Sequence, residues 1–331
     1  MPLQSVLSFL FLITFRFSFF MFFFQKCNFV LLLLVKRKIK IKGRVATLNQ
    51  ILYGKPVAEK IKQNVADEIS SGSLKPILAL IRVGDRPDDV SFAKSITKNC
   101  ENLGIGVLDY HLAEDGTEAE LLPTTIIDCN EDENVSAIML LRPLPKHLNE
   151  KKIVNLINPL KDVDGITVFS QAMVYGDSCD GFAPCTAQSC MEILDFYNID
   201  LTGKNVVVLG RSLVVGKPLA MMLLKKNATV TICHSKTKNL QEICKAADIV
   251  IVAIGKAKFL TSDYVRDGQI VLDVGINLDE NGKLCGDVDF EGIKDIVASA
   301  TPVPGGVGPV TSALICQHII QAHKKGMTSK C

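Results

Sequence analysis

An alternation of short apolar runs with helical patterns from Ile51 onward most limits what this chain can fold into. The run "ILALIRVG" is typical of a buried parallel strand, and "GKPVAEKIKQNVADEIS" before it has apolar residues at helical spacing. A second helix, "DDVSFAKSITKNCENLG", is expected to be capped by Asp88 or Asp89 and to stop at Gly104. "GVLDYHL", a helix from Glu118 and "VSAIMLLRP" continue the series. Such a succession predicts an α/β fold with a parallel sheet and helices on its faces.

A second α/β unit begins near Gln171. Its predicted strands are "KNVVVLG", "ATVTICHS", "DIVIVAIG" and "QIVLDVG", with helices in "RSLVVGKPLAMMLLKKN" and around Leu240–Ala246. The loop "ATPVPGGVGPVT" leads to a last helix, "SALICQHIIQAHKKG". We therefore expect two α/β domains, joined near Thr167–Ala183.

The first 44 residues differ from the rest of the chain. They hold eight basic residues and no acidic one, so of the formal net charge of +2 the remaining residues carry −6. A mildly acidic body gives no support for nucleic-acid binding. The apolar stretch "FSFFMFFFQKCNFVLLLLV" with its flank "KRKIKIKGR" is typical of a membrane segment with a basic cytoplasmic flank, although Lys26 and Asn28 interrupt it.

Three interpretations of residues 1–44 stay open. The segment lacks the basic start and the small-residue cleavage site of a signal peptide. We favour a gene-start artefact with translation from Val45 or Leu48, because Phe, Leu, Ile and Lys runs are typical of translated AT-rich sequence. A membrane anchor and some other extension are the alternatives. We expect the body to be cytoplasmic, with a membrane contact only if residues 1–44 are translated.

The eleven cysteines show no metal-binding spacing. Cys179, Cys185 and Cys190 are too far apart for a C-x-x-C pair, and no histidine pair accompanies them. An odd count without a disulfide framework predicts reduced thiols in a cytosolic core, and we predict no metal site.

A candidate dinucleotide site lies in "VVVLGRSLVVGKP", where Gly210 ends a strand and Gly216 starts a helix. Glycine at such a turn lets the backbone approach a pyrophosphate, and the helix N-terminus supplies N–H groups and partial positive charge. The spacing G-x-x-x-x-x-G is not the full G-x-G-x-x-G pattern, so an ordinary strand–turn–helix glycine pair is the alternative.

The residues around the next strand favour NADP over NAD. An NAD site usually has an acidic residue at the end of its second strand, whereas "TVTICHSKTKN" ends in His234, Ser235, Lys236 and Thr237. Arg211 directly follows the first glycine. Arg, Ser and Lys can bind a 2′-phosphate that a carboxylate would repel. A solvated basic loop is the alternative.

With these residues in place, the chain resembles the FolD family of bifunctional methylenetetrahydrofolate dehydrogenase/methenyltetrahydrofolate cyclohydrolases over about Ile51 to Gly326. The motifs that carry the resemblance are "GKPVAEKI", "VGDRP", "RPLPKHLNEKKIVNLINPLKDVDGI", "PCT", "GRSLVVGKP", "ATVTICHSKTKNL", "DVGIN", "GDVDF" and "TPVPGGVGPVT". The resemblance implies two α/β domains around a folate cleft, the second a Rossmann-like doubly wound parallel sheet, and a homodimer. It implies a folate-binding domain at 46–170 completed by a C-terminal helix at 312–326, and an NADP-binding domain at 171–311.

The family's chemistry centres on a Tyr-x-x-x-Lys helix, from which this chain departs. Alignment from "VGDRP" to Cys100 without a gap places Phe92 at the tyrosine position and Ile96 at the lysine position. Lys94 and Lys98 are each two residues further on, about 200° around a helix. We expect both to point away from the cleft as solvated surface lysines.

Further departures accompany the missing lysine. The family's glutamine before "LPLP", which orients the lysine, is replaced by Leu141, and Arg142 follows it. Asp89 stands at the family's serine near the helix start, and Ala187 and Ser189 replace Pro and Gly. Loss of the lysine together with its partner argues against an isolated sequencing error.

The family's ligand-binding residues remain. Asp164 in "KDVDG" matches the pterin-contacting carboxylate, with a turn-forming Asp before Gly as the alternative. Phe92 can still stack on the aminobenzoate ring. The loop Thr301–Thr311 resembles the one beside folate and nicotinamide, with a rigid connector as the alternative. The catalytic positions are Ile96, Leu141 and Asp164; folate is assigned to Phe92, Asp164, Pro304, Gly305 and Gly306, and NADP to Gly210, Arg211, Ser212, Gly216, His234, Ser235 and Thr311.

We therefore expect NADP-dependent oxidation of 5,10-methylenetetrahydrofolate to 5,10-methenyltetrahydrofolate in one-carbon metabolism, with weak or lost cyclohydrolase activity. Hydride transfer needs two ligands held at near-attack distance, whereas hydrolysis needs a group that activates water and protonates a nitrogen. Losing one such acid–base group costs about 10²–10⁴-fold. A fully bifunctional enzyme and a non-catalytic protein that binds folate and NADP are the alternatives.

Overall fold

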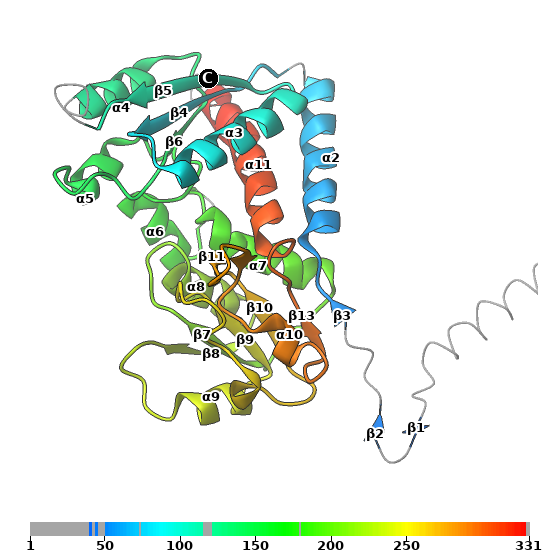
Figure 1. Cartoon of the computed structure of the whole chain (residues 1–331). Coiled ribbons are helices and arrows are strands. Elements are labelled where there is room, and N and C mark those ends of the chain that lie inside the picture. Colours follow the sequence, from blue (N-terminus) through cyan, green and yellow to red (C-terminus); the bar gives the residue numbers. More distant parts are fainter. Residues whose placement is uncertain are drawn as a thin grey trace, which may run out of the picture. The chain divides into compact units, whose positions relative to one another are not determined.

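The fold comes from a computed structural model that describes most of the chain from residue 50 onward. The described residues are 40–41, 44–45 and 50–328, without Ser73, 115–120 and Cys179. The chain divides into two compact units, Met1–Leu48 and Asn49–Cys331. The second unit holds the α/β body (Figure 1).

The N-terminal extension expected at 1–44 lies almost wholly outside the described residues. Within it, β1 (Lys40–Ile41) and β2 (Arg44–Val45) pair antiparallel. In the described ranges, no helix is both long enough and apolar enough to cross a membrane.

The first sheet is parallel, with three strands in the order β5-β4-β6. Its strands are β4 (Ile77–Val83), β5 (Gly106–Leu112) and β6 (Ala137–Leu140), and its helices are α2 (Gly54–Gly72), α3 (Pro87–Asn102) and α4 (Leu122–Glu131). Because successive side chains of a strand point to opposite faces, β4 feeds two apolar layers. Leu78 and Leu80 pack in the layer that contains α2 and α3, whereas Ala79 and Ile81 pack with α4. This explains the uninterrupted apolar run of β4.

The second sheet has six parallel strands in the order β3-β13-β10-β9-β7-β8. The strands are β3 (Gln50–Ile51), β7 (Asn205–Leu209), β8 (Thr229–Cys233), β9 (Ile249–Val252), β10 (Ile270–Asp273) and β13 (Ser299–Ala300). Helices α7 (Cys185–Phe196) and α8 (Gly216–Lys225) contribute to the apolar layer on one face, and α9 (Leu240–Ala246) and α10 (Phe290–Ile293) to the layer on the other. The predicted Rossmann-like sheet is confirmed.

The remaining elements are α5 (Glu150–Ile153), η2 (Val154–Leu156), α6 (Val168–Tyr175), η3 (Ser262–Tyr264), β11 (Asn277–Leu278) and β12 (Leu284–Cys285).

Both ends of the body cross between the two sheets. β3 pairs with β13 in the second sheet, although the residues that follow it form the first domain. The last helix, α11 (Val307–Thr328), runs beside α2 and also contacts α7 and α3 (Figure 1). The division at 46–170, 171–311 and 312–326 stays a prediction.

Two predicted helix starts are wrong. The N-cap of α3 is Arg86 rather than Asp88 or Asp89, because Pro87 opens the helix and the Asp89 carboxylate accepts from the Arg86 guanidinium at 2.7 and 2.8 Å. The last helix begins at Val307, five residues before its expected start, so the loop ends at Gly306. Proline in a first helical turn, here Pro309, gives up no hydrogen bond of the helix interior. Gly104, with φ 78°, follows the end of α3 as expected.

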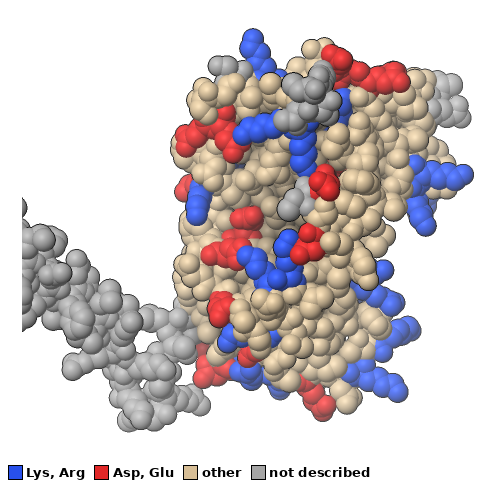
Figure 2. Space-filling view, turned by 180° about the vertical axis from the view of Figure 1, so that it is seen from behind, with Lys and Arg blue, Asp and Glu red and all other residues tan. Residues whose placement is uncertain are grey.

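The cysteines and charges agree with a reduced α/β protein of mixed surface. Eight cysteines in the described part are buried free thiols: Cys100, Cys129, Cys185, Cys190, Cys233, Cys244, Cys285 and Cys316. Figure 2 shows acidic and basic side chains intermixed on the face in view. Within the described ranges, no cluster of three His, Cys, Asp or Glu side chains is placed to hold a metal ion.

The apolar layer around α11 predicts a large loss of stability when a core side chain there is removed. Leu314 is fully buried in the layer shared by α2, α3 and both sheets. We expect Leu314→Ala to lower the free energy of unfolding by about 2–5 kcal/mol, since it leaves a cavity. Denaturant unfolding measures this. Leu224→Ala, at a residue that is 57% exposed, is the control and should change stability by less than about 0.5 kcal/mol.

Candidate active site

A cleft of about 690 Å³ is lined by segments attached to both sheets. α3 and the end of β6 contribute Phe92, Leu141 and Arg142. The loops after β7 and β10 contribute Val214 and Ile276. The lining is mostly apolar with few charged groups, as in sites that bind small organic molecules.

The turn after β7 can accept only glycine at its two key positions. Gly210 has φ 120°, and a Cβ there would lie 2.2 Å from the carbonyl oxygen of Ala253, which follows β9. A Cβ on Gly216, the first residue of α8, would lie 2.1 Å from the carbonyl oxygen of Gly210. β7 lies between β8 and β9, where the strand order reverses, and doubly wound sheets bind dinucleotides at such a point. The geometry of this turn fits a dinucleotide, because a turn without side chains lets a pyrophosphate approach the backbone N–H groups at the start of α8.

The backbone brings the predicted phosphate-binding residues to the same edge. The Gly210 N–H donates to the carbonyl oxygen of Cys233 at 2.9 Å, which joins the turn after β7 to the end of β8. Ser212 Oγ accepts from the Val215 N–H at 3.0 Å and so shapes the turn. Arg211 and Ser235 are exposed. His234 is half-buried; its backbone N–H donates to the Thr237 hydroxyl, and its ring Nδ1 accepts from the backbone N–H of Lys236.

Asp164 and Arg142 face each other in the cleft. The nearest nitrogen of Arg142 lies 3.7 Å from Asp164 Oδ2, and both side chains are 19% exposed. Burial raises the pKa of Asp164 to about 6, although the neighbouring guanidinium acts to lower it. Most Asp164 carboxyl groups are therefore charged at neutral pH, and the protonated form is close in free energy.

The two catalytic positions that depart from the family are apolar and buried. Ile96 is fully buried in the layer formed by α2, α3 and α11, and Leu141 is 6% exposed. Lys94 and Lys98 line a separate groove on the opposite side of α3, beside Arg82. Among the described residues that line the cleft there is no lysine.

The proline/glycine loop fastens α2 to the second sheet. The Gly54 N–H donates to the Gly305 carbonyl oxygen at 2.8 Å, and a Cβ on Gly54 would lie 1.8 Å from the carbonyl oxygen of Gly306. Pro304, Gly305 and Gly306 are not among the residues that line the cleft, whereas Thr311 is. Thr311 shares a hydrogen bond of 2.9 Å with the Ser189 hydroxyl.

Two buried carboxylates that the sequence interpretation missed hold the loops beside the cleft. Asp287 accepts from the backbone N–H groups of Ile254, Gly255 and Lys256 at 2.6–3.0 Å and from the Asn277 amide at 2.9 Å. These bonds tie the loop after β9 to the segment after β10. The motifs "DVGIN" and "GDVDF" contain the signal, because a buried Asp needs such donors.

Asp273 completes this network at the end of β10. Its carboxylate accepts from the N–H groups of Gly275, Asp287 and Val288 at 2.9–3.0 Å. Burial raises the pKa of Asp273 to about 7, against the lowering effect of these three donors. The network positions Val274, which lines the cleft.

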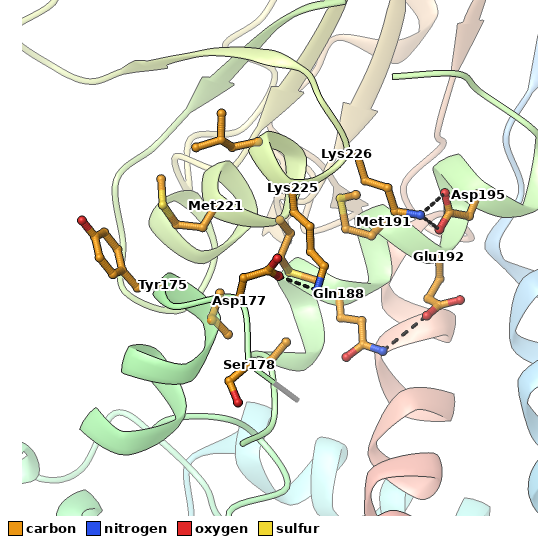
Figure 3. Close-up of a pocket in the computed structure, with 14 residues that line it drawn as sticks. Tyr175, Asp177, Ser178, Gln188, Met191, Glu192, Asp195, Met221, Lys225 and Lys226 are labelled. Carbon is orange, nitrogen blue, oxygen red and sulfur yellow. Dashed lines mark hydrogen bonds and ion pairs between the residues drawn. The ribbon is translucent and has the colours of Figure 1, made fainter. Parts of the chain in front are cut away.

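A second hollow, of about 430 Å³, lies between α6, α7 and α8 (Figure 3). Four of its charged side chains form ion pairs, Lys225 with Asp177 and Lys226 with Asp195 at 2.9 Å, and the Glu192 carboxylate accepts from the Gln188 amide at 3.3 Å (Figure 3). Among the residues that the structure describes, none lines both this hollow and the cleft, and none of the predicted site residues lines the hollow. We therefore place the candidate site in the cleft.

The fold and cleft define an α/β enzyme with a parallel-sheet catalytic domain and an NAD(P)-binding domain. Two family models match: "Tetrahydrofolate dehydrogenase/cyclohydrolase, catalytic domain" at residues 52–164 and "Tetrahydrofolate dehydrogenase/cyclohydrolase, NAD(P)-binding domain" at 184–327. The chain belongs to this family, the FolD family, and is a methylenetetrahydrofolate dehydrogenase/cyclohydrolase enzyme. Membership argues against the non-catalytic alternative.

Individual relatives cover nearly the whole body. The chain is 47% identical to "Bifunctional protein FolD" of Clostridioides difficile over 283 residues, 85% of this chain and 98% of the relative. It is similar to the bifunctional FolD structure from Campylobacter jejuni, with 42% identity, a TM-score of 0.80 and coverage of 83% and 99%. A Trypanosoma brucei FolD structure with NADP cofactor and inhibitor has 30% identity, a TM-score of 0.79 and coverage of 84% and 98%.

The glycine turn predicts a severe effect of one methyl group. In Gly216→Ala the new Cβ would overlap the backbone oxygen of Gly210, so the turn must shift. We expect at least about tenfold weaker binding of NAD and NADP in calorimetric titration, together with a lower Tm. Gly326→Ala in α11 is the control, since its Cβ would meet nothing within 4 Å, and it should leave binding unchanged. Wild-type affinity in a folded Gly216→Ala protein would contradict a dinucleotide cradle here.

Proposed function

We propose that this enzyme oxidises 5,10-methylenetetrahydrofolate to 5,10-methenyltetrahydrofolate with NADP and hydrolyses the methenyl product weakly or not at all. One observation carries the second part: no lysine is found among the described residues that line the cleft. Ile96, at the family's lysine position, lies in the apolar core, and Leu141 cannot orient an ammonium group.

Retained binding groups support the dehydrogenase activity. Phe92 offers a ring to the aminobenzoate, and Asp164 offers a carboxylate to the N–H groups of the pterin. Gly210 and Gly216 fit a pyrophosphate, and Arg211 and Ser235 are exposed at the edge where a 2′-phosphate would lie. When bound, NADP supplies the hydride acceptor. The protein's part is to hold both ligands and to exclude water, which needs no acid–base group.

The cation that does line the cleft is a poor substitute for the lysine. Arg142 is the only Lys or Arg among the described lining residues. A guanidinium keeps its protons at neutral pH, so it cannot take a proton from water. This supports a selective loss of hydrolysis.

A fully bifunctional enzyme is the second candidate, and the comparisons favour it. The relatives are named as bifunctional proteins, and nothing in the comparisons supports a lost cyclohydrolase. The cleft also offers a physical route, because Asp164 has a pKa raised to about 6 and can exchange a proton near neutral pH. Measurement of the methenyl product distinguishes the two candidates.

With methylenetetrahydrofolate and NADP supplied, we expect methenyltetrahydrofolate to accumulate and then to decay at the rate of enzyme-free buffer. The reason is the missing group that would activate water, whose loss costs about 10²–10⁴-fold. Absorbance of the methenyl product follows both phases. Rapid decay that scales with enzyme concentration would contradict the proposal and establish the bifunctional candidate.

A pair of double variants tests whether the two apolar positions cause the loss. Ile96→Lys with Leu141→Gln should raise hydrolysis, because it restores an ammonium together with a polar partner. Ile96→Met with Leu141→Met is the matched control; it conserves volume and supplies no proton-transfer group, so hydrolysis should stay at the wild-type level. Equal hydrolysis by both folded variants would contradict the assignment of these positions.

NADP selectivity is expected to depend on Arg211. We expect Arg211→Ala to raise the KM for NADP by about tenfold or more, because a charge-assisted hydrogen bond to a phosphate is lost. The KM for NAD should change by less than about twofold, since NAD lacks that phosphate. Steady-state kinetics with both cofactors decides, and a parallel rise of the two KM values would contradict a contact with the 2′-phosphate.

We also propose a homodimer and a cytoplasmic location for the body. The homodimer rests on the family resemblance, whereas the location rests on the cysteines, eight of which are buried free thiols in the described residues. A membrane contact depends on translation of residues 1–44.

A further inference from the structure

Arg142 presents more hydrogen-bond donors than it has partners. A guanidinium carries five N–H donors. Its Nε is buried without a partner, and its terminal nitrogens lie 3.6 Å from Glu150 Oε1 and 3.7 Å from Asp164 Oδ2. Both distances exceed the range of about 2.7–3.2 Å for an N–H···O bond. A buried donor set left unpaired beside a cleft indicates that an acceptor of the ligand completes it.

The surroundings of Arg142 hold the guanidinium in place. The Leu141 N–H donates to the Ile81 carbonyl oxygen at 2.9 Å, so the segment continues the sheet. The Glu150 carboxylate accepts from the Leu144 N–H at 2.9 Å and is thereby fixed next to the guanidinium. Arg142 lies between the Glu150 carboxylate, which is held by this bond, and the Asp164 carboxylate, and this limits where its free N–H groups can point.

The substrate offers the matching pattern. The pyrimidinone edge of a reduced pterin carries two neighbouring donors, the 2-amino group and N3–H, followed by the 4-oxo acceptor. A carboxylate binds the two donors, and a cation beside that carboxylate binds the carbonyl. Asp164 and Arg142 both line the cleft, with a guanidinium nitrogen 3.7 Å from Asp164 Oδ2. Together they offer the acceptors and the donor that this edge of the pterin needs.

We propose that Arg142 is a substrate-binding residue, an inference that rests on the proposed function. Its guanidinium donates to the 4-oxo oxygen of the folate substrate, beside the pterin N–H groups that donate to Asp164. It makes the enzyme select 4-oxo pterins over 4-amino analogues. At the "LPLP" position where the family carries leucine, this chain therefore has a specificity-determining cation. It also keeps Asp164 charged, because the guanidinium lowers the pKa of that carboxyl.

The experiment combines a protein change with a ligand change. Tetrahydrofolate and its 2,4-diamino analogue, in which a donor replaces the 4-oxo acceptor, are titrated calorimetrically against wild type and Arg142→Leu. The ratio of the Kd of the diamino analogue to the Kd of tetrahydrofolate should be roughly 10- to 100-fold larger for wild type than for Arg142→Leu, as expected for a charge-assisted hydrogen bond. The KM for methylenetetrahydrofolate should rise by a similar factor, while the KM for NADP stays within about twofold.

The pH dependence gives a readout that a merely structural role would not move. Loss of the guanidinium raises the pKa of Asp164, so the acid limb of kcat/KM should shift to higher pH. The other charged or titratable groups around Asp164 are the same in both proteins: Glu150, Asp162, Asp88, Asp89 and Cys185. The shift can therefore be assigned to Arg142.

Arg82→Leu is the matched control. Arg82 also has a buried Nε without a hydrogen-bond partner, but it lines the groove on the far side of α3, so ligand preference and pH profile should stay as in wild type. If Arg142→Leu does not fold, Arg142→Lys keeps the charge and loses the planar fork, and it should show an intermediate preference. An unchanged preference and acid limb in either folded variant overturns the proposal. A wild type that binds tetrahydrofolate but does not reduce NADP when methylenetetrahydrofolate is supplied refutes the proposed function, and the binding comparison still decides the role of Arg142.

Discussion

The packing of α2, α3 and α11 into one apolar layer is the constraint on which the cleft depends. Ile96 and Leu314 are fully buried in this layer, which also receives side chains from both sheets. The helix that carries Phe92 is therefore fixed against the helix that carries Thr311. The same packing that positions the ligand-binding residues also makes position 96 a core position. Ligand binding needs α3 to pack with apolar side chains, whereas proton transfer would need a polar group on the same helix.

Elements with strong local signals could be predicted from the sequence. β4 and β9 are continuous apolar runs, and the turn at Gly210 and Gly216 follows from the need for a close backbone approach. Lys94 and Lys98 lie on the face of α3 that helical periodicity assigns to them. In each case a single stretch of chain contains the information.

Features that depend on distant partners could not be predicted. The motif "GDVDF" shows that Asp287 needs hydrogen-bond donors if it is buried, but not that these donors are the N–H groups after β9, more than thirty residues away. The two residues of β3 are too few for a period to show. The donor set of Arg142 gains its meaning only from the positions of Asp164 and Glu150. The N-cap of α3 was misassigned because Arg86 competes for the Asp89 carboxylate.

The pairing of β3 with β13 has a consequence for modular exchange in this fold. The chain leaves the second sheet at its first strand and comes back to the first sheet with α11, so neither domain is one uninterrupted stretch. A recombination event with a single crossover would strip an edge strand from one sheet or a covering helix from the other. An exchange of one whole domain between homologues would therefore need to carry both of the segments that build it.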